Sequence, residues 1–426
     1  MRVILPGKPF HRHGFSTVGI ASTTERVEKG QFIGAAGLFL LAAAATASIS
    51  IHDPLTGWGY ALGIFLLSGY GAIRDVLIPR AFRLTIPGFA LVLISLWGFL
   101  QLAAGTTVYR YGTWDASLRT AALGATAFVA SRTLTNARLR LRFLWAFAWF
   151  GCAVSMISVV AYFTSPGRVL WIFPSPYPDA WGVFLSRNDF AGFLELSFPV
   201  ALWLGLKRVP RAGGPHAERL RMPLWAPASM LAAGLASSSR AGAALLIVEA
   251  AVILVMIPGR RAALRFGALA VALIAIAGAG TLAGRLADPD PLRYRREIAE
   301  STMNMIAEHP WRGFGLGSFS QVYPAYAKFD AGAVVEHAHD DWLEWAAEGG
   351  IPLAVVWMVL AMGTCAPAFR SVWGLGILAA LLHALVDYPF ARFGLTAWNF
   401  ALIGALNGAE VREVSQSGHY LSGTRR

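Results

Sequence analysis

The chain has 426 residues, of which 56% are hydrophobic and only 14% charged, and its mean hydropathy is +0.53. A soluble protein carries about a quarter charged residues, so this composition excludes an ordinary soluble globular fold. The formal charge of +12 does not indicate nucleic-acid binding, because the basic residues lie in short connections between apolar stretches. Cys152 and Cys365 lie within apolar stretches and suggest no disulfide framework.

Apolar runs of about 20 residues recur along the chain, and a run of that length can cross a bilayer as a helix. We therefore predict an all-α polytopic membrane protein with twelve spans. The expected spans are 32–51, 56–73, 86–104, 114–131, 143–163, 190–206, 223–238, 242–257, 266–283, 351–366, 372–388 and 393–408. The fourth is the weakest, since Asp115 and Arg119 lie near its start.

Basic residues gather in alternate connections, which is the pattern of cytoplasmic loops. They lie in the tail 1–31, in the connections near 74–83, 132–142, 207–221 and 260–265, and at Arg370, whereas the loops 52–55 and 105–113 hold at most one each. Both tails, 1–31 and 409–426, are thus expected in the cytoplasm. Spans 1–9 occupy 32–283, a large polar loop with helices occupies 284–350 on the outer side, and spans 10–12 occupy 351–408.

Polar features cluster on that outer side. Arg187 and Asn188 stand at the start of span six, where Asn188 or Asp189 could cap the helix. The short turn SSSRAG places Arg240 at the membrane surface, either reaching to the interface or facing a polar cavity. His383 and Asp387 are one helical turn apart near the outer end of span eleven, which puts them on one face.

The loop 284–350 holds three motifs. The arginines at 293–296 precede a helix-like run, and they are either phosphate ligands or the solvated face of an amphipathic helix. The segment HPWRGFGLGSF lacks the Lys-Ser/Thr ending of a nucleotide-binding loop, so its glycines are expected in tight turns. In HAHDDWLEW, His337 and His339 share a face if the segment is extended, and an imidazole there could be a general base, a structural group or a metal ligand.

These motifs occur in the order RND, SSSRAG, HPWRGFGLGSF and HAHDDWLEWAAEGG. In this order, residues 180–410 resemble the O-antigen ligase and O-antigen polymerase (Wzy-type) superfamily of bacterial membrane glycosyltransferases. The histidine signature of that family is His, then Asn, Ser or Asp, nine residues, then Gly-x-x-Gly. His339, Asp340 and Gly350 fit it, whereas Leu353 replaces the second glycine. LVDYPF, which holds Asp387, is similar to a late-span motif of many relatives.

The resemblance also extends to the arginines. Arg187 with Asn188 matches the pair that enters span six, and Arg240 matches the arginine of the short turn. The family's arginine before Met-Ile-x-x-His-Pro best matches Arg295. Ala299 stands where a tryptophan is common, so Arg293 or Arg296 could take the role instead.

This resemblance implies a GT-C-like, metal-independent, inverting glycosyltransferase of the bacterial inner membrane, with its site facing the periplasm and no cofactor. The implied donor is a glycan on undecaprenyl pyrophosphate, and the acceptor is a hydroxyl of a glycan, of lipid A core or of a protein. His339 is the expected base. The expected substrate-binding residues are Arg187, Asn188, Arg240, Arg293, Arg295, His337, Asp340 and Asp387.

Two other functions fit the same residues less well. A transporter or flippase for an anionic lipid-linked glycan would explain outward arginines, but it should carry charged or interrupted helices near mid-membrane and internal repeats. Neither is found in the sequence, since the polar groups gather on one side. A non-catalytic assembly scaffold would leave the paired histidines unexplained.

Overall fold

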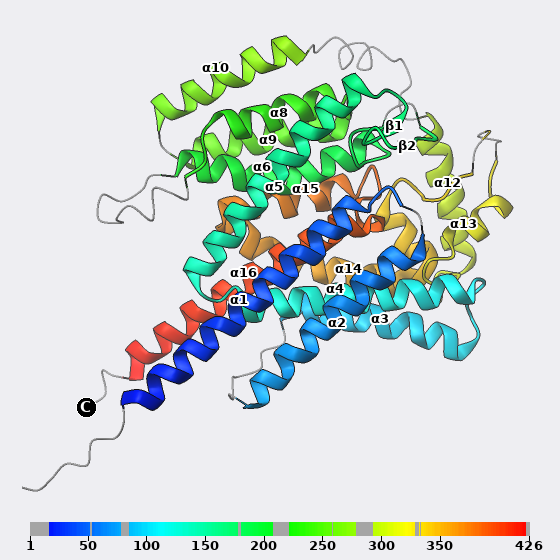
Figure 1. Ribbon diagram of the computed structural model, residues 1–426. Helices are drawn as coiled ribbons and strands as arrows, with labels where there is room; N and C mark the ends of the chain where they lie inside the picture. The colour runs from blue at the N-terminus through cyan, green and yellow to red at the C-terminus, as the bar shows by residue number, and fades with distance from the viewer. Residues whose placement is uncertain are drawn as a thin grey trace, which may run out of the picture.

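The computed structural model describes residues 17–51, 53–77, 85–177, 180–207, 221–257, 259–277, 293–328, 332 and 334–422. Within these ranges, side chains at 17–24, 26, 277, 293 and 410–422 are left undescribed. The described residues form a bundle of helices, with one two-stranded hairpin in the connection between α5 (Ala137–Thr164) and α6 (Arg187–Leu206) (Figure 1).

The first half contains α1 (Thr17–Ala47), α2 (Pro54–Leu77), α3 (Ile86–Ala104), α4 (Arg110–Thr133), α5 (Ala137–Thr164), β1 (Arg168–Val169), β2 (Phe173–Pro174) and α6 (Arg187–Leu206). The second half contains α8 (Trp225–Ala236), α9 (Arg240–Met256), α10 (Arg260–Ala277), α12 (Arg293–Glu308), α13 (Phe319–Val322), η2 (Tyr323–Ala325), α14 (Asp341–Arg370), η3 (Val372–Gly374), α15 (Leu375–His383), η4 (Pro389–Ala391) and α16 (Phe393–Ser422). The strands pair antiparallel, with Val169 opposite Phe173.

Each of the twelve expected spans overlaps a helix in the described residues, but the ends of some spans are not helical, such as 48–51 and 384–388, and 278–283 lie outside the described residues. Six of these helices (α1, α2, α3, α5, α6 and α14) are long and apolar enough to cross a membrane, and two shorter apolar helices lie at Trp225–Ala236 and Val372–His383. The all-α polytopic architecture is therefore supported, whereas the number twelve stays a prediction.

Several helix boundaries differ from the expected spans. α1 begins at Thr17 and α16 continues to Ser422, because helical hydrogen bonding does not stop where the apolar run stops. α14 begins at Asp341, ten residues before the expected start of its span. Asp340 caps it by accepting a hydrogen bond from the Leu343 amide at 3.0 Å.

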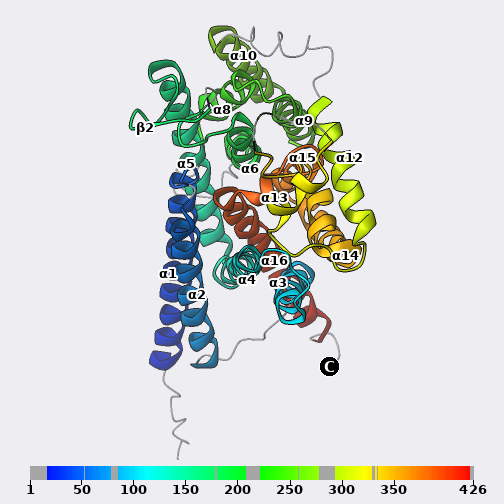
Figure 2. The same ribbon diagram turned by 90° about the vertical axis from the view of Figure 1, so that its right-hand side faces the viewer.

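α6 is the central helix of the half of the bundle that carries the site. It packs against α5, α8, α9 and α15, and Figure 2 shows it in the middle of these four. Nearly all of its apolar window is buried, at 94%, compared with 17% for α2. The exposed leucines of α2, such as Leu62 and Leu66, are suited to contact with lipid. α6 is therefore shielded by protein on all sides.

The polar segments gather at one end of the bundle, which we call the α12 end because α12 and α13 lie there (Figures 1 and 2). The glycine-rich loop docks on the start of α14, where Gly315 N donates to Glu348 O at 2.8 Å. Gln101 at the end of α3 donates from Nε2 to the carbonyls of Arg312 and Glu348 at 2.7 and 2.9 Å. The loop thus forms tight turns, as the sequence predicts, with Gly313, Gly315 and Gly317 at positive φ.

A kink at Gly350 lets α14 pass from this docking region into its apolar part. Gly350 has φ 73° and ψ 177°, and a Cβ there would lie 2.6 Å from the carbonyl carbon of Trp311. The adjacent amide of Ile351 donates to Pro310 O at 2.7 Å. Only glycine combines this backbone conformation with so close an approach of another chain segment.

Candidate active site

A cleft of about 530 Å³ opens at the α12 end, among α6, α9, α12, α15 and the segment before α14. It gathers residues from distant parts of the chain, namely Arg187, Asn188, Ser238, Arg240, Ala241, Tyr294, Arg295, Ile298, His339, His383 and Val386. Five of the expected site residues (Arg187, Asn188, Arg240, Arg295 and His339) therefore line one cavity.

Arg187, Asn188 and Arg240 are held by the first turns of two neighbouring helices. Ser186 caps α6 by accepting from the Asn188 amide at 3.1 Å, and Ser239 caps α9 by accepting from the Gly242 amide at 3.3 Å. The α6 cap is thus Ser186, rather than Asn188 or Asp189. A helix N-terminus carries partial positive charge, so both ends add to the guanidinium charges of Arg187 and Arg240. This corner of the cleft is suited to an anion.

His339 faces the cleft in a fixed orientation. Its Nδ1 lies 3.1 Å from Asp387 Oδ1, and its ring packs edge-on against Tyr388 at a centroid distance of 4.9 Å. The backbone of His339 has φ 53°, which is uncommon for a residue with a side chain. About one third of the side chain is exposed, at 32%. The Nδ1 atom is therefore engaged with Asp387, and Nε2 is the ring nitrogen left for a substrate.

Asp387 is the residue on which the polar groups converge. Its Oδ2 lies 3.7 Å from Arg295 Nη2 and 3.9 Å from His383 Nε2, and Arg295 also donates to the Val386 carbonyl. Burial opposes ionisation of Asp387, but the hydrogen bond with His339 and the charge of Arg295 outweigh it and lower its pKa to about 2. Asp387 is thus a carboxylate at every physiological pH, and it lies in the turn after α15.

Behind Asp387, the buried pair of His383 and Glu195 continues the polar chain into the bundle. His383 Nδ1 lies 2.8 Å from Glu195 Oε1, and the two side chains are 2% and 0% exposed. Glu195 is on α6, two turns below Arg187. Sequence reasoning noted His383 but missed Glu195, and the expectation that no charged residue lies within the spans was wrong, because Glu195 lies inside α6 and Glu249 inside α9. A carboxylate within an apolar run was the available signal, because such a group needs a buried partner.

His337 is held differently from His339. Its Nδ1 lies 2.9 Å from Glu344 Oε1, and its ring stacks on Tyr388 at 4.4 Å. Burial disfavours the charged form, but the neighbouring Glu344 carboxylate outweighs it, so the pKa of His337 lies above its usual value. His337 does not line the cleft, and neither does Asp340, which caps α14. Their binding of substrate stays a prediction.

The arginines of α12 separate into distinct positions. Arg295 lines the cleft together with Tyr294, whereas Arg296 is not among the lining residues. Arg293 is the first residue of α12, and its side chain lies outside the described residues. Of the three candidates, Arg295 is therefore the one that the described part of the structure brings beside His339.

Arg392 and Asp189 form a further ion pair that sequence reasoning missed. Arg392 Nε lies 3.3 Å from Asp189 Oδ2, and the guanidinium stands over the Tyr388 ring at 5.1 Å. Burial opposes its charge, but Asp189 outweighs that effect and raises the pKa of Arg392 further above its usual value. Because Asp189 comes directly after Arg187 and Asn188, this pair fixes the start of α6 against the segment that holds Tyr388.

These features define a polytopic helical membrane protein whose site, at one end of the bundle, joins an aspartate–histidine pair to several arginines. Residues 226–358 match the family model described as O-antigen ligase. This match supports membership in the O-antigen ligase and polymerase family, as the motifs suggested. It contains Arg240, Arg295 and His339, whereas Arg187, Asn188 and Asp387 lie outside it. No curated protein matches the chain.

Proposed function

We propose that the cleft transfers a glycan from undecaprenyl pyrophosphate to an acceptor hydroxyl, at the periplasmic face of the bacterial inner membrane. The observation that carries this proposal is the 3.1 Å contact of His339 Nδ1 with Asp387 Oδ1 in a cleft also lined by three arginines. The match to the O-antigen ligase family supports glycosyl transfer in general. The alternation of basic loops supports the periplasmic orientation.

His339 acts as the general base in this scheme. With Nδ1–H donated to Asp387, the imidazole is in the tautomer whose Nε2 carries a lone pair. Nε2 can then accept the proton of an acceptor hydroxyl that is bound in the cleft. Asp387 holds the ring in place and stabilises the imidazolium that results, because it is ionised beforehand. A positioned base of this kind contributes about 10²–10⁴ in rate.

The arginines act on the leaving group. Pyrophosphate gains negative charge as the bond from the anomeric carbon to the phosphate oxygen breaks. Guanidinium groups and two helix N-termini aimed at it favour the transition state over the ground state. Arg187, Arg240 and Arg295 line the cleft from α6, α9 and α12, so they can contact the pyrophosphate from different sides. The family resemblance implies a metal-independent reaction, in which the charge of these arginines stabilises the leaving pyrophosphate.

The proposed transfer is a single displacement at the anomeric carbon. The acceptor oxygen attacks the anomeric carbon from the face opposite the pyrophosphate, so the configuration inverts. The carbon–oxygen bond to the pyrophosphate breaks, and its electron pair leaves with the lipid pyrophosphate. The acceptor proton passes to His339 Nε2. The donor is already activated, which removes the need for a nucleotide or an ion gradient.

The test is glycan transfer from a lipid-linked donor in proteoliposomes that contain the purified full chain and no gradient. We expect His339→Ala and Arg240→Ala each to reduce turnover about 10²-fold or more. His309→Ala is the matched control, because His309 lies on the same side of the protein, is half exposed and does not line the cleft. Near-normal turnover in both site variants would overturn the proposal, and gradient-dependent movement of an intact donor would favour a transporter.

The class of acceptor is decided by a second measurement. Mass spectrometry of envelope glycans from a deletion strain separates the alternatives that share this chemistry. Long chains left unattached to lipid A core indicate a ligase, and single repeat units indicate a polymerase. Loss of glycan from a protein hydroxyl indicates a protein glycosyltransferase.

A further inference from the structure

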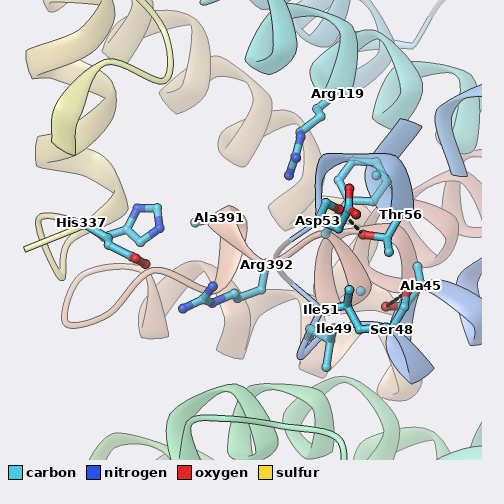
Figure 3. Close-up of a pocket in the computed structure, with 14 residues that line it drawn as sticks. Ala45, Ser48, Ile49, Ile51, Asp53, Thr56, Arg119, His337, Ala391 and Arg392 are labelled. Atoms are coloured by element: carbon cyan, nitrogen blue, oxygen red, sulfur yellow. Dashed lines mark hydrogen bonds between the residues drawn. The ribbon is translucent and has the colours of Figure 1, made fainter. Parts of the chain in front are cut away.

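A second cavity, of about 250 Å³, opens at the α12 end on the other side of Tyr388. It lies among the end of α1, the start of α2, α4 and the segments 336–337 and 391–394, and Figure 3 shows it in close-up. Among the residues that the structure describes, this cavity shares no lining residue with the cleft. Its volume is below the range of drug-sized ligand pockets, which begins at about 300 Å³, so it is suited to one small polar group.

One aromatic ring connects the two cavities. Tyr388 stacks on His337, which lines the second cavity, and contacts the edge of His339, which lines the cleft. The distances between ring centroids are 4.4 and 4.9 Å. A molecule held in the second cavity is therefore only a few side chains away from the candidate base.

Arg119 projects into this cavity from α4 and is fixed on three sides (Figure 3). Its Nε lies 2.8 Å from Asp115 Oδ2, and its guanidinium carbon lies 5.8 Å from the Phe393 ring centroid. A Cβ on Gly57 would come within 3.3 Å of that carbon, so the guanidinium rests closely on the first turns of α2. A guanidinium that is held by Nε presents its terminal N–H groups at little further entropic cost.

Arg392 supplies a second fixed guanidinium from the opposite wall (Figure 3). It is held by Asp189 at 3.3 Å and by the face of Tyr388, and its side chain is 17% exposed. The acidic groups that line the cavity, Asp53 and Glu336, are in exposed residues. Asp53 also accepts from the Leu55 amide at 2.8 Å, which directs its charge to the start of α2. The fixed charged groups that line the cavity are thus the two guanidiniums, each paired through Nε with an aspartate that is not among the lining residues.

We propose that the second cavity is a subsite for an anionic group of the acceptor, with Arg119 and Arg392 as its ligands. This rests on the function proposed above. Two guanidinium forks recognise phosphate or carboxylate oxygens in a way that a neutral hydroxyl cannot match. The anionic group is either a phosphate on an acceptor sugar or the pyrophosphate of a lipid-linked acceptor. Arg119 is a specificity residue that binds the acceptor at a distance from the reacting atoms.

Acceptor kinetics in proteoliposomes test this subsite. Two pairs of acceptors are compared at saturating donor: a saccharide with and without a phosphate monoester, and a lipid-linked saccharide with a pyrophosphate or a monophosphate. We expect Arg119→Gln to raise the KM of the preferred acceptor about tenfold or more, with the donor KM changed less than about twofold. The pair whose KM ratio falls to about one in Arg119→Gln identifies the source of the anion.

Two further variants serve as controls for this test. Arg132→Gln is the matched control. Arg132 lies on α4 thirteen residues after Arg119, about 20 Å along the helix, and it is likewise paired with an aspartate, Asp75. Arg119→Lys keeps the charge but loses the fork, so its acceptor KM should lie between those of wild type and Arg119→Gln. An acceptor KM in Arg119→Gln equal to that in Arg132→Gln, or donor and acceptor KM values that rise together, would overturn the subsite. Absence of transfer by the wild type would instead refute the proposed function.

Discussion

His339 and Asp387 are 48 residues apart in the chain, and their side chains meet with 3.1 Å between Nδ1 and Oδ1. The contact joins the segment before α14 to the turn after α15. At this contact His339 has φ 53°, a conformation that costs roughly 1 kcal/mol or more for a residue with a Cβ. The fold therefore maintains this pair at the expense of local backbone strain.

The first prediction concerns the carboxylate of this pair. Asp387→Asn should lower the turnover number about 10²-fold or more, because an amide can donate to Nδ1 and thereby favour the wrong imidazole tautomer. The KM for the donor should change less, since Asp387 does not line the cleft. Turnover in proteoliposomes checks this. Asp75→Asn, which breaks an ion pair with Arg132 on α4, serves as the control. Equal turnover in the two variants would contradict the assigned role.

The second prediction separates charge from geometry at Arg240. Arg240→Lys should restore little of the activity that Arg240→Gln loses, because a lysine is a point charge without the planar fork that grips phosphate oxygens. We expect both variants to lose about 10²–10³ in turnover number. A lysine variant at near wild-type rate would mean that only charge is needed there. Arg296→Lys, outside the cleft lining, is the comparison.

The third prediction concerns the pH dependence of stability. The fold lowers the pKa of Asp387 from 3.8 to about 2, so its ionised form is favoured in the native state. Its contribution, about 2 kcal/mol, is complete above about pH 4 and is lost as the pH falls toward 2. Infrared difference spectra of wild type and Asp387→Asn should therefore show an Asp387 carboxylate band that persists at pH 4. In His339→Ala the same band should disappear at a higher pH, because the hydrogen bond that lowers the pKa of Asp387 is lost. If the band of Asp387 titrates at the same pH in both proteins, His339 does not lower that pKa.

The fourth prediction concerns the buried pair of Glu195 and His383. Glu195→Ala should reduce the free energy of unfolding by about 3 kcal/mol, because it leaves His383 buried without its closest partner. Replacing both residues by leucine should cost less than the single change, since neither member of the pair is then left buried without the other. Thermal denaturation of the detergent-solubilised chain measures both. A double variant less stable than Glu195→Ala would indicate that the pair itself stabilises the bundle.

The fifth prediction concerns the kink in α14. Gly350→Ala should destabilise the protein by about 2 kcal/mol or more, because the new Cβ would meet the backbone of Trp311 at 2.6 Å in a left-handed conformation. It should also reduce turnover, since α14 begins next to His339. Gly59→Ala in α2 is the control: nothing lies within 4 Å of its Cβ position, so alanine there should be neutral or stabilising. Thermal denaturation and transfer assays on both variants check this.

Much of the site could be named from the sequence because its motifs are local. SSSRAG and RND place Arg240 and Arg187 at helix starts, and the histidine motif places His339 just before α14. The partners of these residues could not be named in the same way. The contacts from Glu195 to His383 and from Arg392 to Asp189 span many residues, and they join α6 to α15 and to the residue before α16. Nothing in the local pattern specifies which face of α6 meets α15.

The sequence by itself determined that this protein is a helical membrane protein and approximately where its apolar helices lie. Runs of apolar residues decide this without knowledge of neighbours, because every backbone group in lipid must be bonded within its own helix. Only the tertiary structure decided that His339 pairs with Asp387, that Arg295 is the α12 arginine beside it, and that His337 faces a different cavity. Those relationships depend on how the helices pack, and packing is settled by contacts between residues far apart in the chain.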